Sequence, residues 1–258
     1  MSPQPADVAT YALRLGDDAL VASHRTGEWI ASAPQLEEDV ALGNIALDLL
    51  GQARALLTYA GSLRTSWGEP ARTEDDLAYH RDERDWLNVQ LVEIGDDGDF
   101  GRCMARLLVL SAWQRELWER LQGSADATLA AVAAKAVKEV DYHRDHATQW
   151  VLRLGDGTGE SHERMQRALD AVWPYVDELF ERDALVDRLV DAGVAADPAG
   201  LREPVLAYVG AVIAEATLRV PETTVRHSGG RRGVHTEQLG YLLAEMQHLA
   251  RSHPDARW

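Results

Sequence analysis

Apolar residues recur along nearly the whole chain with the spacing of an amphipathic α-helix, and this periodicity limits the fold more than any other feature. Alternation typical of strands is scarce, and runs of β-branched residues are almost absent. We therefore predict an all-α protein. The predicted helices are about 6–32 with a break near Gly16, 34–62, 75–94, 100–122, 126–154, 160–180 with a kink at Pro174, 183–192, 197–218 and 236–252.

Four of these helices are long: 34–62, 75–94, 100–122 and 126–154. The segments that join them are short, apart from the loop at 63–74. Long helices with short connections favour an up-and-down bundle. The 258 residues suit one large domain. We predict a single domain over 1–258, with a four-helix core at about 34–154, an extra helix before it, and C-terminal helices at about 160–258.

Composition and charge exclude several classes of protein. Hydrophobic residues make up 46% of the chain and charged residues 26%, a balance typical of globular proteins and not of disordered ones. We expect neither a membrane span of roughly 18–20 apolar residues nor a signal peptide. The chain has a single cysteine, Cys103, which excludes an internal disulfide and a zinc site built from thiolates. We expect Cys103 to be a small buried hydrophobic residue. We expect the protein to be cytoplasmic. The net charge of −16 disfavours nucleic acid and anionic lipid as partners.

Polar residues interrupt the predicted helix at 34–62. Asn44, Asp48 and Gln52 lie at positions i, i+4 and i+8, so they share one face of an otherwise apolar stretch. A buried aspartate costs several kcal/mol unless it is paired or bound to metal. Two interpretations remain open here: a surface stripe or hydrogen-bonded core network, and a remnant or working metal position.

The predicted helix at 126–154 carries a dense run of carboxylates and imidazoles at 138–146. Glu139 and His143 lie one turn apart, as two ligands of one ion can. A carboxylate-bridged di-iron site in a four-helix bundle needs one Glu from each of two helices and Glu-x-x-His from each of the other two. Glu245–His248 is the one match to that motif, and it lies in the last helix, where we expect a surface or packing role.

The remaining core helices do not complete a di-iron set. The segment 75–94 offers Asp85 and, three residues on, Asn88. The middle of 100–122 carries Leu108, Ser111 and Ala112 in place of carboxylates. The ligand pattern therefore favours the bundle architecture without the metal.

A basic island, residues 226–235, stands out in an acidic chain. It contains Arg226, Arg231, Arg232 and His235, and it precedes a predicted helix N-terminus, a place suited to a phosphate or carboxylate. Its glycines lack the spacing of a P-loop. A connecting loop, a docking surface for a partner subunit and a contact for a phosphorylated ligand all remain open.

Six stretches, spread from the first predicted helix to the last, resemble one family in order and spacing. They are LGDDAL at 15–20, NIALDLLGQAR at 44–54, RDER at 81–84, LRLGDGT at 152–158, GVHTEQLG at 233–240 and AEMQ at 244–247. The chain resembles the PaaC family, whose members are part of the bacterial phenylacetyl-CoA epoxidase. The resemblance implies a ferritin-like fold and a role in aerobic phenylacetate catabolism.

The same resemblance implies a non-catalytic structural subunit that binds no cofactor itself. Its partner would be a PaaA-type subunit that carries the di-iron site and binds the CoA thioester. Other epoxidase subunits and a reductase with NADPH, FAD and an iron–sulfur centre would complete the complex, and the chain alone would form a homodimer. A polar interior would then remain where a metal once bound, at Asn44, Asp48, Gln52, Asp85, Asn88, Glu139 and His143.

One alternative keeps the chemistry in this chain. It is a di-iron oxidoreductase in its own right, with an irregular ligand set drawn from Asp48, Asp85, Glu139 and His143. The absence of a mid-helix carboxylate in 100–122 weighs against it.

Overall fold

The computed structural model describes residues 3–254 and 256, and in this part of the chain every regular element is helical. This confirms the all-α prediction. The α-helices are α1 (Pro5–Gly27), α2 (Leu36–Leu63), α3 (Glu74–Tyr79), α4 (Phe100–Leu121), α5 (Ala127–Gly155), α6 (Gly159–Val172), α7 (Ala184–Asp191), α8 (Pro198–Glu215) and α9 (Glu237–Ser252). Short 3₁₀ turns are η1 (Arg64–Trp67), η2 (Glu83–Asp85), η3 (Gln90–Val92), η4 (Trp173–Tyr175), η5 (Asp177–Phe180) and η6 (Gly230–Arg232).

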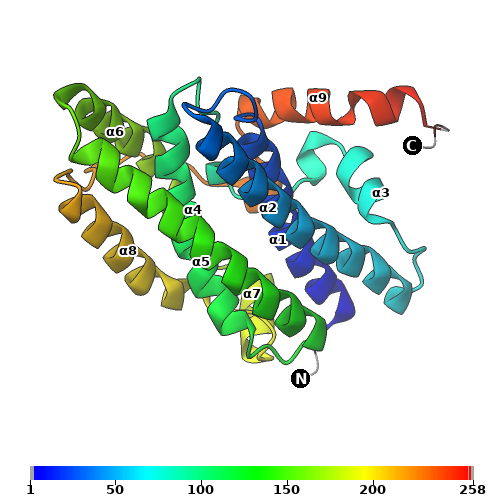
Figure 1. Ribbon diagram of the computed structural model, residues 1–258. Helices are drawn as coiled ribbons and strands as arrows, with labels where there is room; N and C mark the ends of the chain where they lie inside the picture. The colour runs from blue at the N-terminus through cyan, green and yellow to red at the C-terminus, as the bar shows by residue number, and fades with distance from the viewer. Residues whose placement is uncertain (1–2, 255, 257–258) are drawn as a thin grey trace.

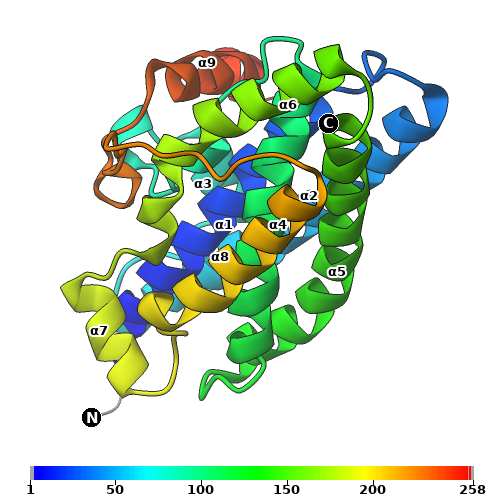
Figure 2. The ribbon, with the colours of Figure 1, turned by 90° about the vertical axis from the view of Figure 1, so that its left-hand side faces the viewer.

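Four long helices form the centre of the molecule as two hairpins. Helices α1 and α2 pack along each other, α4 and α5 do the same, and α2 lies next to α5 (Figures 1 and 2). Helices α6 and α8 pack on α4, and α7 packs near the start of α1. Helix α9 crosses one end of the bundle beside α3. The four-helix core is therefore present, but α1 belongs to it and is not an addition.

The helix predicted at 75–94 is wrong. Helix α3 ends at Tyr79, and the chain continues through η2 and η3 with extended backbone between them. Trp86, Val89, Leu91 and Val92 are all buried, yet they fall on no single face of a helix. Irregular backbone allows all four of these side chains to be buried. The fourth helix of the core is therefore α1 and not the predicted helix at 75–94.

Helix α1 is continuous, so the break expected near Gly16 is also wrong. A side chain at Gly16 would collide with Leu57, because the two helices of the hairpin approach closely there. The glycine is needed for packing between helices and not for a turn. The predicted helix at 160–180 does not continue through a kink at Pro174. Helix α6 ends at Val172, and Pro174 lies in the first turn of η4.

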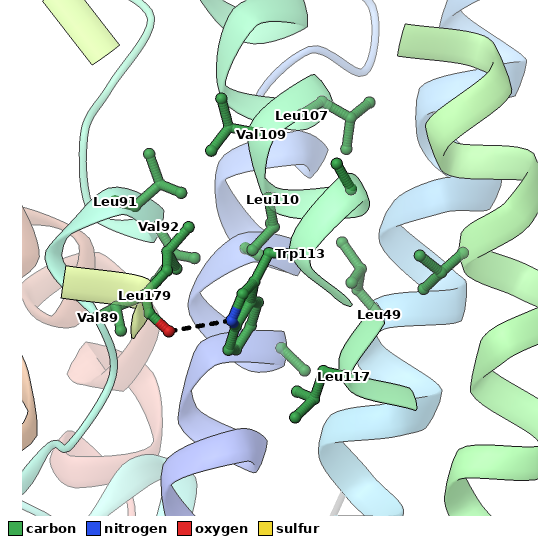
Figure 3. Packing of buried hydrophobic residues seen from close by; sticks show 14 of the residues in the cluster. Leu49, Val89, Leu91, Val92, Leu107, Val109, Leu110, Trp113, Leu117 and Leu179 are labelled. Atoms are coloured by element: carbon green, nitrogen blue, oxygen red, sulfur yellow. Dashed lines mark hydrogen bonds between the residues drawn. The ribbon is translucent and has the colours of Figure 1, made fainter. Parts of the chain in front are cut away.

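The core continues from the hairpins into the non-helical segment. Trp113 of α4 belongs to the same buried cluster as Val89, Leu91 and Val92, and its indole Nε1 donates a hydrogen bond of 3.1 Å to the carbonyl oxygen of Leu179 (Figure 3). Cys103, also on α4, is buried as expected, and burial raises the pKa of its thiol. Helix α4 is therefore the centre of the apolar core.

Helix α2, counted through η1 to Trp67, is long and apolar enough to cross a membrane by length and composition alone. The expectation that no segment approaches such a composition is wrong for this one. Half of its most apolar window is buried, and it packs along α1 and α5. Because core helices of soluble proteins pass the same test, we interpret α2 as a bundle helix.

Two glycines of α2 test how closely the chain packs on this helix. A Cβ at Gly61 would clash with the backbone carbonyl of Arg72, whereas a Cβ at Gly43 would meet nothing. Gly61→Ala should lower the free energy of unfolding by about 1–3 kcal/mol. Gly43→Ala should raise it by up to about 1 kcal/mol, because alanine restricts the unfolded chain. Urea titrations followed by circular dichroism measure both, and equal effects of the two variants would contradict this packing.

Candidate functional site

The interface between α2 and α5 is lined with polar side chains, and we call it the α2–α5 seam. The two helices meet with their polar residues facing each other along several turns. The seam consists of Glu38, Asp48 and Gln52 from α2 and Glu139, His143 and His146 from α5. Four of these six are residues that the sequence predicted as a polar interior: Asp48, Gln52, Glu139 and His143.

The side chains of the seam contact one another in pairs. His143 Nε2 lies 3.1 Å from Asp48 Oδ2. One turn along, Gln52 donates a hydrogen bond of 3.0 Å to Glu139, whose second carboxylate oxygen lies 3.1 Å from Lys135 Nζ. These contacts match the hydrogen-bonded network among the interpretations of the sequence.

Burial disfavours the charged form of both histidines of the seam. The side chain of His143 is fully buried, and this desolvation lowers its pKa despite the contact with Asp48. Burial also lowers the pKa of His146, which lies 3.2 Å from Glu38. Glu38 accepts a hydrogen bond of 2.7 Å from the indole of Trp150.

The donor atoms of the seam do not fit a di-iron centre. Glu139 is committed to Gln52 and Lys135, and an ammonium group beside a carboxylate opposes a metal cation. Across residues 3–254 and 256, no three His, Cys, Asp or Glu side chains are grouped so that they could hold a metal ion. His143 Nδ1 and Gln52 Oε1 are buried without a hydrogen-bond partner in the described structure.

Three of the predicted interior residues lie elsewhere. Asn44 is exposed on α2. Asp85 is exposed at the end of η2, where its carboxylate accepts a hydrogen bond from the backbone of Asp82. Asn88 is buried, but it donates to Glu93 at 2.9 Å, outside the seam. Glu245 and His248 are both exposed on α9, in line with the surface role expected for them.

A second polar cluster lies deeper in the molecule, and we call it the anchor network. It joins α1 to the irregular segment 80–99 and to the basic island through buried ion pairs and hydrogen bonds. Its members are Asp17, Asp18, Arg81, Glu93, Glu178, Arg231 and His235.

Adjacent carboxylates of α1 each bind one arginine of the anchor network. Asp17 pairs with Arg81, and both side chains are almost completely buried. Asp18 Oδ2 lies 2.7 Å from Arg231 Nη2, and its other oxygen accepts the backbone N–H of Val89 at 2.8 Å. Because a buried charge is costly unless paired, these contacts fix the position of both arginines.

Two glutamates of the anchor network bind backbone. Glu178 accepts hydrogen bonds from the N–H groups of Gln90, Gly229 and Gly230 at 2.6–2.8 Å. Burial raises its pKa, and these donors oppose that effect. Glu93 binds His235 Nδ1 at 2.6 Å and the N–H of Thr236 at 2.7 Å. The network therefore fastens two irregular segments to each other.

The basic island divides into an inner and an outer part. Arg231 and His235 make hydrogen bonds inside the anchor network, and a contact of either residue with a partner or a phosphate stays a prediction. Arg226 and Arg232 remain largely exposed, at 71% and 66% of the side chain, beside Asp177 and Glu181.

The sequence did not identify Asp17, Asp18, Arg81, Glu93 or Glu178 as a group. A signal was present in the paired aspartates of an apolar helix, but their partners lie far along the chain.

Arg231 and its neighbour give a matched test of the anchor network. Arg231→Met leaves Asp18 buried without its cation, and we expect a loss of about 3–5 kcal/mol in the free energy of unfolding. Arg232→Met removes an exposed side chain and should be nearly neutral. Chemical denaturation of both variants measures the difference. A small loss for Arg231→Met would show that the pair is not needed.

The Glu93–His235 pair predicts a pH dependence. Contact with Glu93 outweighs burial and raises the pKa of His235 above its usual value of 6.5. A raised pKa in the folded state stabilises the protein below pH 6.5, and the contribution is lost as pH rises through the raised pKa. The stability difference between the wild type and His235→Gln should therefore shrink from pH 6 toward pH 9. A difference that is constant with pH would contradict a charged His235.

The comparisons with known proteins agree with the resemblance seen in the sequence. Residues 2–258 match the PaaA_PaaC family, described as phenylacetic acid catabolic protein. The chain is 47% identical over 251 residues to one of the subunits of the 1,2-phenylacetyl-CoA epoxidase of Escherichia coli (strain K12), an alignment that covers 97% of this chain and 99% of that protein. The chain therefore belongs to the phenylacetic acid catabolic protein family.

Proposed function

We propose that this chain is the structural subunit of a multi-subunit phenylacetyl-CoA 1,2-epoxidase and does not catalyse the reaction itself. The observation that carries the proposal is the identity, over nearly the full length of both chains, to a subunit of such an epoxidase. The enzyme would insert one oxygen atom of O₂ into the aromatic ring of phenylacetyl-CoA. The iron, the reductase with NADPH, FAD and an iron–sulfur centre, and the CoA thioester site would belong to other subunits.

The geometry of the seam supports the structural role. The alternative, a di-iron enzyme in its own right, needs Asp48, Asp85, Glu139 and His143 to converge. Asp85 lies on η2 and binds its own turn, so it does not join the other three. Glu139 is held by an amide and an ammonium group, and the middle of α4 presents Leu108 and Ser111 to the core.

We also propose that the seam is the polar remainder of a metal site. Its members keep positions on facing helices at one-turn spacing, and buried polar atoms of His143 and Gln52 there lack a partner in the described structure. Buried polar atoms outside the seam also lack a partner in the described structure, so the positions on facing helices carry this proposal. The predicted partner is a PaaA-type catalytic subunit, and the predicted compartment is the cytoplasm.

Elemental analysis tests the proposed function. We expect the purified chain to hold no stoichiometric iron, and iron to appear only when it is co-purified with the PaaA-type subunit. Glu139→Gln should leave the iron content and epoxidation rate of that complex unchanged, because the Glu139 carboxylate is already engaged by Gln52 and Lys135. A full di-iron complement in the lone chain, lost in Glu139→Gln, would establish the catalytic alternative.

A further inference from the structure

An apolar stripe runs along the outer side of α2, and we call it the α2 stripe. Leu36, Val40 and Leu47 are 74%, 58% and 65% exposed. At 100° per residue, the helical spacing places all three within about 40° of one another. Three large aliphatic side chains on one line are more than the single exposed apolar residues that any protein surface carries.

The fold itself does not use the α2 stripe. The opposite side of α2 already packs on α1, with Leu42, Leu49 and Leu56 fully buried. Gly43 borders the stripe, and a Cβ there would meet nothing, so the helix backbone is open to a close approach from outside. Only half of the most apolar window of α2 is buried within this chain.

Polar groups border the stripe on the side of the seam. Asn44 and then Asp48 follow the stripe around α2, and the side chain of Asp48 is 36% exposed. Its ionisable partner is His143, whose pKa is lowered by burial, so among the described residues no cation pairs with the Asp48 carboxylate at neutral pH. Tyr142 of α5 is 47% exposed, and its ring lies 6.0 Å from that of His146, whose Nε2 is 3.2 Å from Glu38 of α2.

The charge of the chain argues against a second copy as the occupant. Two copies of net charge −16 repel each other, and pairing this face with itself would bring the acidic first turn of α2 and Asp48 into an acidic environment. A partner that meets this face needs an apolar centre and a cation near Asp48.

We propose that the α2 stripe, together with Asp48 and Tyr142, docks a surface of the PaaA-type subunit that presents apolar side chains and an arginine or lysine opposite Asp48. The inference rests on the proposed function, because that function supplies the multi-subunit complex. It goes further by locating one interface on this chain and by stating the chemistry of the surface that fits it.

Arginine substitutions on α2 test the location. Val40→Arg and Leu47→Arg remove apolar contact and place a cation against the cation expected on the partner. Leu249→Arg is the matched control, because Leu249 is a leucine 51% exposed on α9, away from the seam. Affinity for the co-expressed PaaA-type subunit should fall by about tenfold or more in each α2 variant and stay unchanged in the control. Circular dichroism melting checks that all three variants remain folded.

The charge prediction has its own variant. Asp48→Asn keeps an acceptor for His143 and removes the carboxylate charge. We expect affinity for the partner to fall by about threefold to tenfold at low salt, with a smaller difference in about 0.5 M NaCl. An unchanged affinity would overturn the cation assigned opposite Asp48.

The outcomes separate this inference from the proposed function. If the wild-type chain binds the PaaA-type subunit and the α2 variants bind equally well, the interface is elsewhere while the proposed function stands. If the α2 variants abolish only self-association of the lone chain, the occupant is a second copy and the inference is overturned. If the wild type binds no epoxidase subunit, the proposed function fails and the inference fails with it.

Discussion

The pairing of two adjacent aspartates in α1 with two arginines from distant segments holds the rest of this structure in place. Asp17 binds Arg81, and Asp18 binds Arg231, in surroundings that exclude water. A buried aspartate or arginine without its partner would be unfavourable there. Each arginine is therefore held in place by the carboxylate that it neutralises. The segment 80–99 can therefore dispense with regular helix hydrogen bonds, since Asp17, Asp18 and Glu178 accept backbone N–H groups of this segment instead.

The two polar clusters differ in how completely they are satisfied. The Glu178 carboxylate of the anchor network accepts hydrogen bonds on both oxygens, and Arg231 binds two backbone carbonyls besides Asp18. In the seam, His143 Nδ1 and Gln52 Oε1 have no partner among the described residues. A buried network that determines the fold is expected to satisfy all of its hydrogen-bonding groups, because unpaired buried polar groups destabilise the native state. Unpaired buried atoms also lie beside the anchor network, at Asn88 Oδ1 and Thr236 Oγ1, so the difference concerns only the named members of the two clusters.

Sequence reasoning succeeded where local pattern determines structure. Helices α2, α4 and α5 follow from apolar periodicity, and Asp126 caps α5 as its position predicts. It failed at 75–94, because the burial of Trp86 and the capture of Arg81 depend on Asp17, 64 residues away from Arg81. The inner role of Arg231 depends on Asp18, 213 residues away. Four of the six seam residues were predicted, because one-turn spacing on a helix can be recognised in a sequence. Contacts between separate segments, as in the anchor network, cannot.

The distribution of charge inside the bundle is in keeping with the structural role proposed for this chain. A guanidinium group and a metal ion compete for the same carboxylate oxygens, and a nearby arginine raises the cost of bringing in a second cation. Asp17 and Asp18 are each committed to an arginine, and Glu139 faces a lysine. The interior acids of this chain thus hold its own segments together. Because those acids are engaged within the chain, the bundle can meet other molecules only through its surface. The apolar side of α2 is a part of that surface that the fold leaves uncovered.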